Sequence, residues 1–105
     1  MIEDVIVFKS LFKVEELTHT EVFVLSIVID EDYKNVSDEE IGKVTRIKSS
    51  TARRLLSGLM KKGFITISYT YKEGQKIRII TETEKTTKII KNDRRNYKEW
   101  LKMEI

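Results

Sequence analysis

A short stretch of the sequence gathers cations and hydroxyl groups that could together bind a polyanion. Arginine can donate two parallel hydrogen bonds to a phosphate or a guanine, and serine and threonine can hydrogen-bond to phosphates or bases. Between residues 46 and 57 these side chains are Arg46, Lys48, Ser49, Ser50, Thr51, Arg53, Arg54 and Ser57. The same charges would also suit a solvated helix face, so their placement on the folded chain must decide between the two interpretations.

Other kinds of site chemistry find few candidates in the sequence. The 105 residues include no cysteine and one histidine, His19, which excludes disulfides, thiolate catalysis and a multi-histidine metal site. The acidic residues 30–32 and 38–40 lack the spacing of a calcium loop, and we interpret them as solvated. No nucleophile–base pair or phosphate loop can be assembled. We therefore expect a protein that is not an enzyme and that needs no metal or cofactor.

The charges are distributed unevenly along the chain. The formal net charge is only +3, yet residues 1–40 contain three lysines and eleven acidic residues. Residues 41–80 contain ten basic residues and a single acidic one, Glu73. This basic segment includes Lys72, Lys76 and Arg78 as well as the stretch described above. A nearly pure basic segment beside an acidic one is typical of a polyanion-binding surface.

Two short helices must position the residues of the basic stretch. A capping box at residues 37–40 predicts a helix over about residues 38–45. A second helix is expected from a cap at Ser49 or Ser50 to Gly63. Its core face would be formed by Ala52, Leu55, Leu56 and Leu59, and its opposite face by Ser50, Arg53, Arg54 and Ser57. This arrangement predicts a helix-turn-helix, whose second helix enters the major groove of DNA.

A β-hairpin is expected directly after the second helix. Residues 64–71 alternate apolar and polar side chains and are rich in strand-forming residues. Residues 72–75 supply a turn, and residues 76–80 return as a second strand. A hairpin in this position is a wing, on which Lys72, Lys76 and Arg78 would place positive charge. Tyr69 and Tyr71 fit the alternation of such a ribbon, although they could also stack on bases.

The order of these elements resembles that of winged helix-turn-helix domains. The sequence is similar as well, in the string IGKVTRIKSSTARRLL at residues 41–56 and in LMKKGFI at residues 59–65. The closest likeness is to the multiple-antibiotic-resistance regulator (MarR) type, over about residues 17–90. The resemblance implies a dimeric repressor or activator whose recognition helix lies in the major groove and whose wing reaches the adjacent minor groove. Arg46 occupies the turn position that usually holds glycine, and the wing lacks the usual aspartate-then-arginine pair.

The two ends of the chain complete the expected fold. Val5, Phe8, Leu11 and Phe12 have helical spacing, which favours an N-terminal helix within residues 1–17, with a strand at residues 5–8 as the alternative. A capping box at residues 18–21 starts a buried central helix, and another at 81–84 starts a C-terminal helix of roughly 20 residues. On that last helix Tyr97, Trp100 and Leu101 suggest a dimer contact, or else packing on the N-terminal helix.

Together these patterns predict one domain over residues 1–105, mainly α with a small β-hairpin wing (α+β). It would contain an N-terminal helix at 1–17, a helix-turn-helix with its wing at 18–81, and a long C-terminal helix at 82–105. The expected function is sequence-specific binding of double-stranded DNA by a homodimeric transcriptional regulator. The alternatives are the DNA-recognition module of a plasmid or phage replication or partition protein, and a winged helix that binds only proteins. No apolar run is long enough for a membrane span and no signal peptide is evident, so we expect a cytoplasmic protein.

Overall fold

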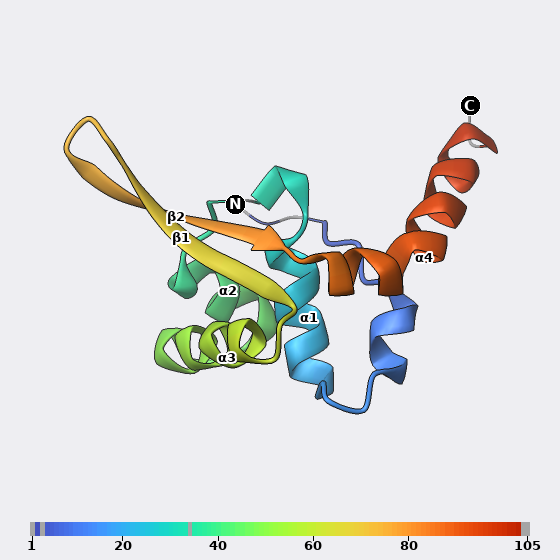
Figure 1. Cartoon of the computed structure of the whole chain (residues 1–105), viewed down its shortest axis with the longest axis horizontal. Coiled ribbons are helices and arrows are strands. Elements are labelled where there is room, and N and C mark those ends of the chain that lie inside the picture. Colours follow the sequence, from blue (N-terminus) through green and yellow to red (C-terminus); the bar gives the residue numbers. More distant parts are fainter. Residues whose placement is uncertain (1, 3, 34, 104–105) are drawn as a thin grey trace.

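The strongly apolar segment at residues 22–29 lies at the centre of the fold. The computed structural model describes residues 2, 4–33 and 35–103. Its elements in chain order are η1 (Lys9–Lys13), α1 (His19–Val28), η2 (Glu31–Tyr33), α2 (Asp38–Thr45), α3 (Ser49–Lys61), β1 (Ile65–Lys72), β2 (Gln75–Glu82) and α4 (Glu84–Met103). The hairpin and the C-terminal end of α4 project from opposite sides of the helical core (Figure 1). This order confirms a mainly helical fold with a small β wing.

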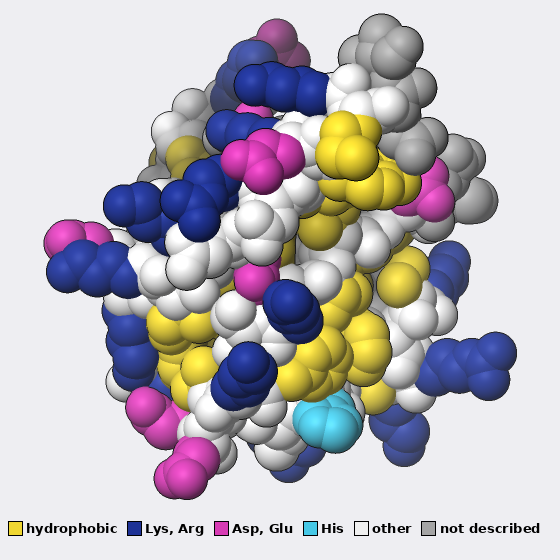
Figure 2. Space-filling model, turned by 90° about the vertical axis from the view of Figure 1, so that its right-hand side faces the viewer, with side chains coloured by type: hydrophobic (Ala, Val, Ile, Leu, Met, Phe, Trp, Pro, Cys, Tyr) yellow, Lys and Arg dark blue, Asp and Glu magenta, His cyan; other side chains and the backbone are white. Residues whose placement is uncertain are grey.

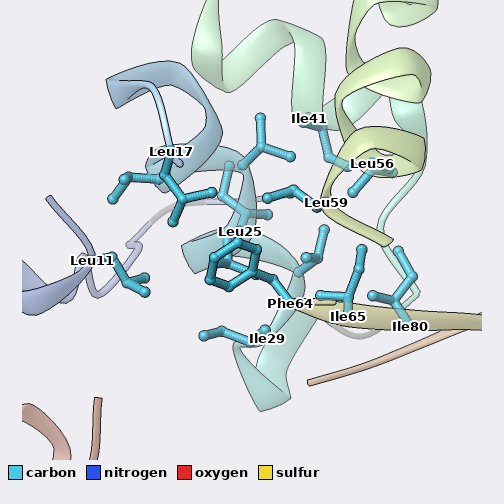
Figure 3. Packing of buried hydrophobic residues seen from close by; sticks show 14 of the residues in the cluster. Leu11, Leu17, Leu25, Ile29, Ile41, Leu56, Leu59, Phe64, Ile65 and Ile80 are labelled. Carbon is cyan, nitrogen blue, oxygen red and sulfur yellow. The ribbon is translucent and has the colours of Figure 1, made fainter. Parts of the chain in front are cut away.

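Helix α1 begins where the sequence predicts and supplies the centre of the core. Thr18 accepts a hydrogen bond from the Glu21 backbone N–H at 3.2 Å, and the Glu21 carboxylate accepts one from the Thr18 N–H at 2.9 Å. This capping box fixes the first turn of α1. Figure 3 shows the side chains of Leu25, Leu59 and Phe64 directed toward one another, and all three are fully buried. The core thus joins α1 to α3 and to the start of the wing.

The turn between α2 and α3 depends on a close approach of two backbone segments. Helix α2 has the predicted bounds and the predicted capping box at Ser37. The Ile47 N–H donates to the Gly42 carbonyl at 2.9 Å, and a Cβ atom at Gly42 would lie only 2.5 Å from the Ile47 carbonyl oxygen. Only glycine fits there without a shift of the backbone. Arg46, between them, has the left-handed conformation with φ 60° and ψ 43°.

The cap of α3 differs from the prediction. Lys48 occupies the N-cap position and makes no side-chain capping bond, while Ser49 and Ser50 are the first two helical residues. Neither hydroxyl group therefore serves as the N-cap of α3, the role that the sequence suggested for one of them. Past the end of α3 Gly63 has a φ of 85°, which accounts for the glycine that the sequence placed there.

Strands β1 and β2 form a regular antiparallel wing. Their register runs from Ile65 opposite Glu82 to Lys72 opposite Gln75. At the tip, Glu73 and Gly74 both have positive φ, as a type I′ turn requires. The predicted capping box at residues 81–84 is wrong, because Thr81 belongs to β2 and pairs with Thr66. The ladder extends to Glu82, since pairing with β1 satisfies the backbone better than an early helix start would.

The expected N-terminal helix is wrong, and so is the alternative strand. Residues 4–8 are neither helical nor paired, and only the short η1 follows them. Phe8 and Leu11 are nonetheless buried in the core, so the apolar spacing reflects packing of an irregular segment. Helix α4, by contrast, has 20 residues as expected. None of the helices in the described part of the chain is both long and apolar enough to cross a membrane.

Three ion-pair and hydrogen-bond contacts attach the outer elements to this core. Asp93 of α4 accepts bonds from the Ser10 N–H and hydroxyl group, both at 2.9 Å, which ties α4 to η1. Arg94 donates to both carboxylate oxygens of Glu82 at the end of β2. Lys62 donates to Glu21 at 2.9 and 3.1 Å and to the Glu16 carbonyl at 2.6 Å. The last contact holds the end of α3 against the start of α1.

The Glu21–Lys62 contact makes the free energy of unfolding depend on pH in the acid range. Burial raises the pKa of Glu21, but the hydrogen bonds from Lys62 and Thr18 outweigh burial and hold the pKa below its ordinary value of 4.5. A depressed folded-state pKa stabilises the fold above the ordinary value, and this contribution is lost as the pH falls through the folded-state pKa.

We therefore expect the free energy of unfolding of Glu21→Gln to depend less on pH in the acid range. The free energy of unfolding, measured with urea between about pH 5 and pH 3, should fall less steeply in this variant than in the unmodified protein. Glu15→Gln, which changes an exposed carboxyl group, is the matched control and should leave the slope unchanged. Equal slopes for all three proteins would contradict the assignment of this pH dependence to Glu21.

Candidate nucleic-acid interface

Helix α3 separates its apolar and polar residues onto two faces. Ala52, Leu56 and Leu59 are buried against the core. The opposite face exposes Ser50, Arg53 and Arg54, while Thr51 and Ser57 are partly buried at its edges. Arg46, Lys48 and Ser49 are exposed at the start of the helix. The structure thus brings the residues of the basic stretch together on one surface, with the N-terminal amides of α3 beside them as additional donors.

The wing carries a second group of cations. Lys72 and Lys76 are exposed near its tip, and the Lys76 ammonium lies 4.3 Å from the centre of the Tyr69 ring. This cation–π contact orients Lys76 across the strand pair. Tyr69 and Tyr71 are 55% and 72% exposed, so neither ring is used by the core. The outer half of the wing is therefore a polar, cationic ribbon with two solvent-exposed aromatic rings, one of which contacts Lys76.

Arg78 differs from the other cations because its guanidinium group is held inside the protein. Its Nη1 donates to the Asp38 carboxylate at 2.6 Å and its Nη2 to the Val36 carbonyl at 3.0 Å. The side chain is only 21% exposed. Arg53 of α3 donates from Nε to the other oxygen of Asp38 at 3.1 Å, while its own side chain remains 79% exposed.

Asp38 also belongs to this surface, and its interpretation from the sequence as a solvated acid is wrong, because its side chain is 12% exposed and accepts hydrogen bonds from Arg53 and Arg78. Its position in the first turn of α2 is explained by the helix dipole alone, and nothing in the sequence connects it to Arg78 forty positions later. Burial raises the pKa of Asp38, but the hydrogen bonds from Arg78 and Arg53 outweigh burial and leave the pKa below its ordinary value. Asp38 therefore stays ionised at neutral pH and offsets part of the positive charge around it.

A groove runs between the wing and the helix-turn-helix. Its volume is about 700 Å³, and its lining residues are Asn35, Val36, Ser37, Asp38, Arg53, Tyr69, Lys76, Ile77 and Arg78. Three cations from α3 and β2 thus converge on one concave surface. Such a surface suits a phosphodiester backbone, because phosphates are bound by arginine, lysine and hydroxyl groups. Within the described ranges, no group of three acidic or histidine side chains could hold a metal ion.

The end of α4 exposes aromatic and aliphatic side chains. The rings of Tyr97 and Trp100 are stacked with their centroids 6.0 Å apart. Trp100 is 52% exposed and Leu101 41% exposed, so neither is enclosed by its own chain. The attachment of α4 to the N-terminal segment instead uses Asp93 and Ser10. Figure 2, which faces the side of the molecule where α4 lies, shows hydrophobic patches between Lys and Arg side chains.

Comparisons with known proteins show which fold this surface belongs to. No protein-family model and no curated protein matches the sequence. MepR, a transcription regulator of the Staphylococcus aureus multidrug efflux pump MepA, is similar in structure with a TM-score of 0.58 and 20% identity, over 90% of this chain and 70% of that one. The transcriptional regulator SlyA matches with a TM-score of 0.58 and 16% identity, over 90% and 64% of the two chains.

A crystal structure of MarR gives the same result. Its TM-score is 0.56 and its identity 21%, over 83% of this chain and 61% of MarR. At such low identities the likeness concerns the arrangement of the backbone. The chain accordingly has the winged helix-turn-helix fold of the MarR-type transcription regulators.

Proposed function

We propose that the protein is a transcriptional regulator that binds double-stranded DNA in a sequence-specific manner. Helix α3 would lie in the major groove, and the basic wing would lie on the adjacent backbone or minor groove. The observation that carries this proposal is the exposed cationic and hydroxyl face of α3, set beside a cationic wing on a winged helix-turn-helix fold. The solvated-face interpretation accounts for neither the wing nor the groove between the two elements.

The cations of this surface divide into two roles by their positions. Arg53 and Arg54 lie on the exposed face of α3, where arginine can reach base edges and read guanine. Lys48 precedes the first turn of α3, and Lys72 and Lys76 lie on the outer wing, where they would meet phosphates. Arg46 would add positive charge beside Lys48. Ser49, Ser50, Thr51 and Ser57 would contact phosphates or bases from the same face, and Arg78 would act through Asp38.

The proposal predicts that binding of duplex DNA depends strongly on salt. Each phosphate that a lysine or arginine neutralises releases counterions, so the log–log slope of affinity against salt should be about −0.9 per phosphate. We expect several phosphates to be involved. The measurement is a titration of labelled duplex by fluorescence anisotropy at salt concentrations between about 50 and 200 mM.

Matched variants test which cations produce the slope. Lys72→Ala and Lys76→Ala should each weaken binding to all sequences and reduce the slope by about one unit. Lys88→Ala is the control, because Lys88 is an exposed cation on α4 that pairs with Glu84. A flat salt response of the unmodified protein would remove DNA from the function and favour a winged helix that binds only proteins.

We further propose that the protein is a homodimer that associates through the exposed end of α4. Stacked Tyr97 and Trp100, with Leu101 beside them, offer an apolar and aromatic surface of the kind that is enriched in the cores of interfaces. A dimer would bring two α3 helices to two half-sites on one face of the duplex. The support is the exposure of Trp100 and Leu101, the stacking of Tyr97 on Trp100, and the fold shared with MarR-type regulators.

Ending the chain at residue 95 should convert the dimer into a monomer. The remaining part of α4 keeps Thr86 and Ile90, both fully buried, so the helix-turn-helix should stay folded. Sedimentation equilibrium measures the mass, and far-UV circular dichroism measures the fold. Lys98→Ala, which removes an exposed cation from the same helix, is the control and should leave the mass unchanged. The same mass for truncated and full-length chains would assign residues 96–103 to a role within one chain.

A further inference from the structure

Asp38 lies where three elements of the proposed DNA-binding surface meet. It is the first residue of α2, and its two carboxylate oxygens accept hydrogen bonds from Arg78 of β2 and Arg53 of α3. The Asp38 side chain is only 12% exposed. A single carboxylate therefore connects the helix-turn-helix to the wing from inside the groove.

The contact with Arg78 fixes the middle of the wing. Arg78 is opposite Tyr69 in the ladder, beyond the buried root formed by Ile65 and Ile80. Its guanidinium group is bound at two points, by the Asp38 carboxylate and by the Val36 carbonyl, so it cannot rotate without losing one of them. A hairpin held only at its root can bend along its length. The Arg78 contact therefore sets the angle between the wing and α2.

The contact with Arg53 fixes the direction of a candidate reading residue. Arg53 uses only its Nε–H for Asp38, which leaves the N–H groups of Nη1 and Nη2 for a ligand. A free arginine side chain loses rotamer entropy when it is immobilised on a ligand. Holding Arg53 by Nε reduces that loss and limits the orientations that its outer edge can take.

We propose that Asp38 is a positioning residue that sets the sequence specificity of DNA binding by fixing Arg53 and the wing relative to each other. This inference rests on the proposed function. It assigns a negatively charged residue a favourable role in binding a polyanion, so two effects oppose each other. The charge of Asp38 weakens all DNA binding through repulsion, whereas its hydrogen bonds strengthen binding to the preferred sequence through orientation.

Asp38→Asn separates these two effects, because asparagine has nearly the same shape without the charge. Affinity for a scrambled duplex should rise, while the ratio of affinities for the preferred and scrambled duplexes should fall roughly tenfold, within the range of one lost base contact. Loss of a repulsive charge alone would raise both affinities equally, and misfolding would lower both. Either of those results would overturn the inference.

Glu39→Gln is the matched control for charge. Glu39 follows Asp38 in the same helical turn and is 75% exposed, and its one ion pair among the described residues is with Lys43 of its own helix. Its replacement should raise the affinities for both duplexes by the same small factor and leave their ratio unchanged. A change of ratio equal to that of Asp38→Asn would show that charge at the start of α2, and not the contacts of Asp38, sets specificity.

A second measurement tests the positioning without DNA. The chain has no cysteine, so Lys61→Cys and Gln75→Cys introduce two unique sites for spin labels, one at the end of α3 and one near the wing tip. Pulsed electron paramagnetic resonance measures the distribution of distances between the two spin labels. This distribution should broaden in Asp38→Asn and in Arg78→Gln, and should stay narrow in Glu39→Gln. An unchanged distribution in Asp38→Asn would overturn the inference even if DNA binding is confirmed.

The two measurements also separate this inference from the proposed function. Failure of the unmodified protein to bind duplex DNA would overturn the proposed function, and with it any role of Asp38 in recognition. The labelled variants would then still report whether Asp38 joins the wing to α3. Binding with an unaltered specificity ratio in Asp38→Asn would instead overturn only the role of Asp38.

Discussion

Replacing Phe64 by alanine is expected to lower the free energy of unfolding by about 3–5 kcal/mol. Phe64 is fully buried and links α3 to β1, with its ring among core side chains of α1 and α3. Its carbonyl group also accepts bonds from the Thr86 hydroxyl at 2.6 Å and from the Thr83 N–H at 3.2 Å. Truncation would leave a cavity where α3, the wing and α4 join. A loss of this size approaches the whole stability of a small domain.

Urea denaturation followed by circular dichroism measures this loss. Met60→Ala is the control, because Met60 lies only four positions earlier, in the last turn of α3, but is 41% exposed. It should change stability by much less. A change below about 1 kcal/mol in Phe64→Ala would mean that the core collapses around the missing ring, and that this junction is less rigid than its burial indicates.

At least one of Arg53→Ala and Arg54→Ala should reduce affinity for the preferred duplex by about 1–3 kcal/mol and relax the preference at one base pair. Within the described residues Arg54 has no ion-pair partner, while Arg53 keeps its outer N–H groups free beside Asp38. Both are exposed, so thermal stability should barely change. The preferred duplex is obtained first, by selecting bound sequences from a random duplex library.

Comparison of preferred and scrambled duplexes decides the role of these arginines. Lys72→Ala serves as the reference for a phosphate contact, since it should weaken both duplexes alike. If Arg53→Ala and Arg54→Ala also weaken both duplexes equally, then α3 binds the backbone without reading bases. The proposal of a sequence-specific regulator would then lose its main support.

The parts of the fold that were predictable have local causes. Two capping boxes, at Thr18 and Ser37, place the starts of α1 and α2, because each involves residues three positions apart. The period of 3.6 separates the buried and exposed faces of α3, and the period of two predicts the wing. These signals depend only on residues close together in the sequence, so they can be recognised before the fold is known.

The parts that were missed have causes distant in the sequence. Residues 5–12 have helical spacing, yet the segment is held by core packing and by the Ser10–Asp93 contact, 83 positions apart. The capping box at Thr81 loses to pairing with Thr66 in the neighbouring strand. Asp38 and Arg78 are forty positions apart, so no local pattern could indicate that they pair. Charge counts identified the basic surface, but could not show which of its cations are already engaged.

The left-handed backbone at Arg46 has a consequence for the evolution of this turn. A residue with a Cβ atom costs about 1–2 kcal/mol in that conformation, a strain that glycine would not have. The side chain at this site is exposed beside the start of α3, and its charge would be lost with glycine. Selection for the most stable fold and selection for charge near a polyanion thus favour different amino acids here. Under the proposed function, Arg46 would contribute charge to binding at the cost of part of the stability margin of the fold.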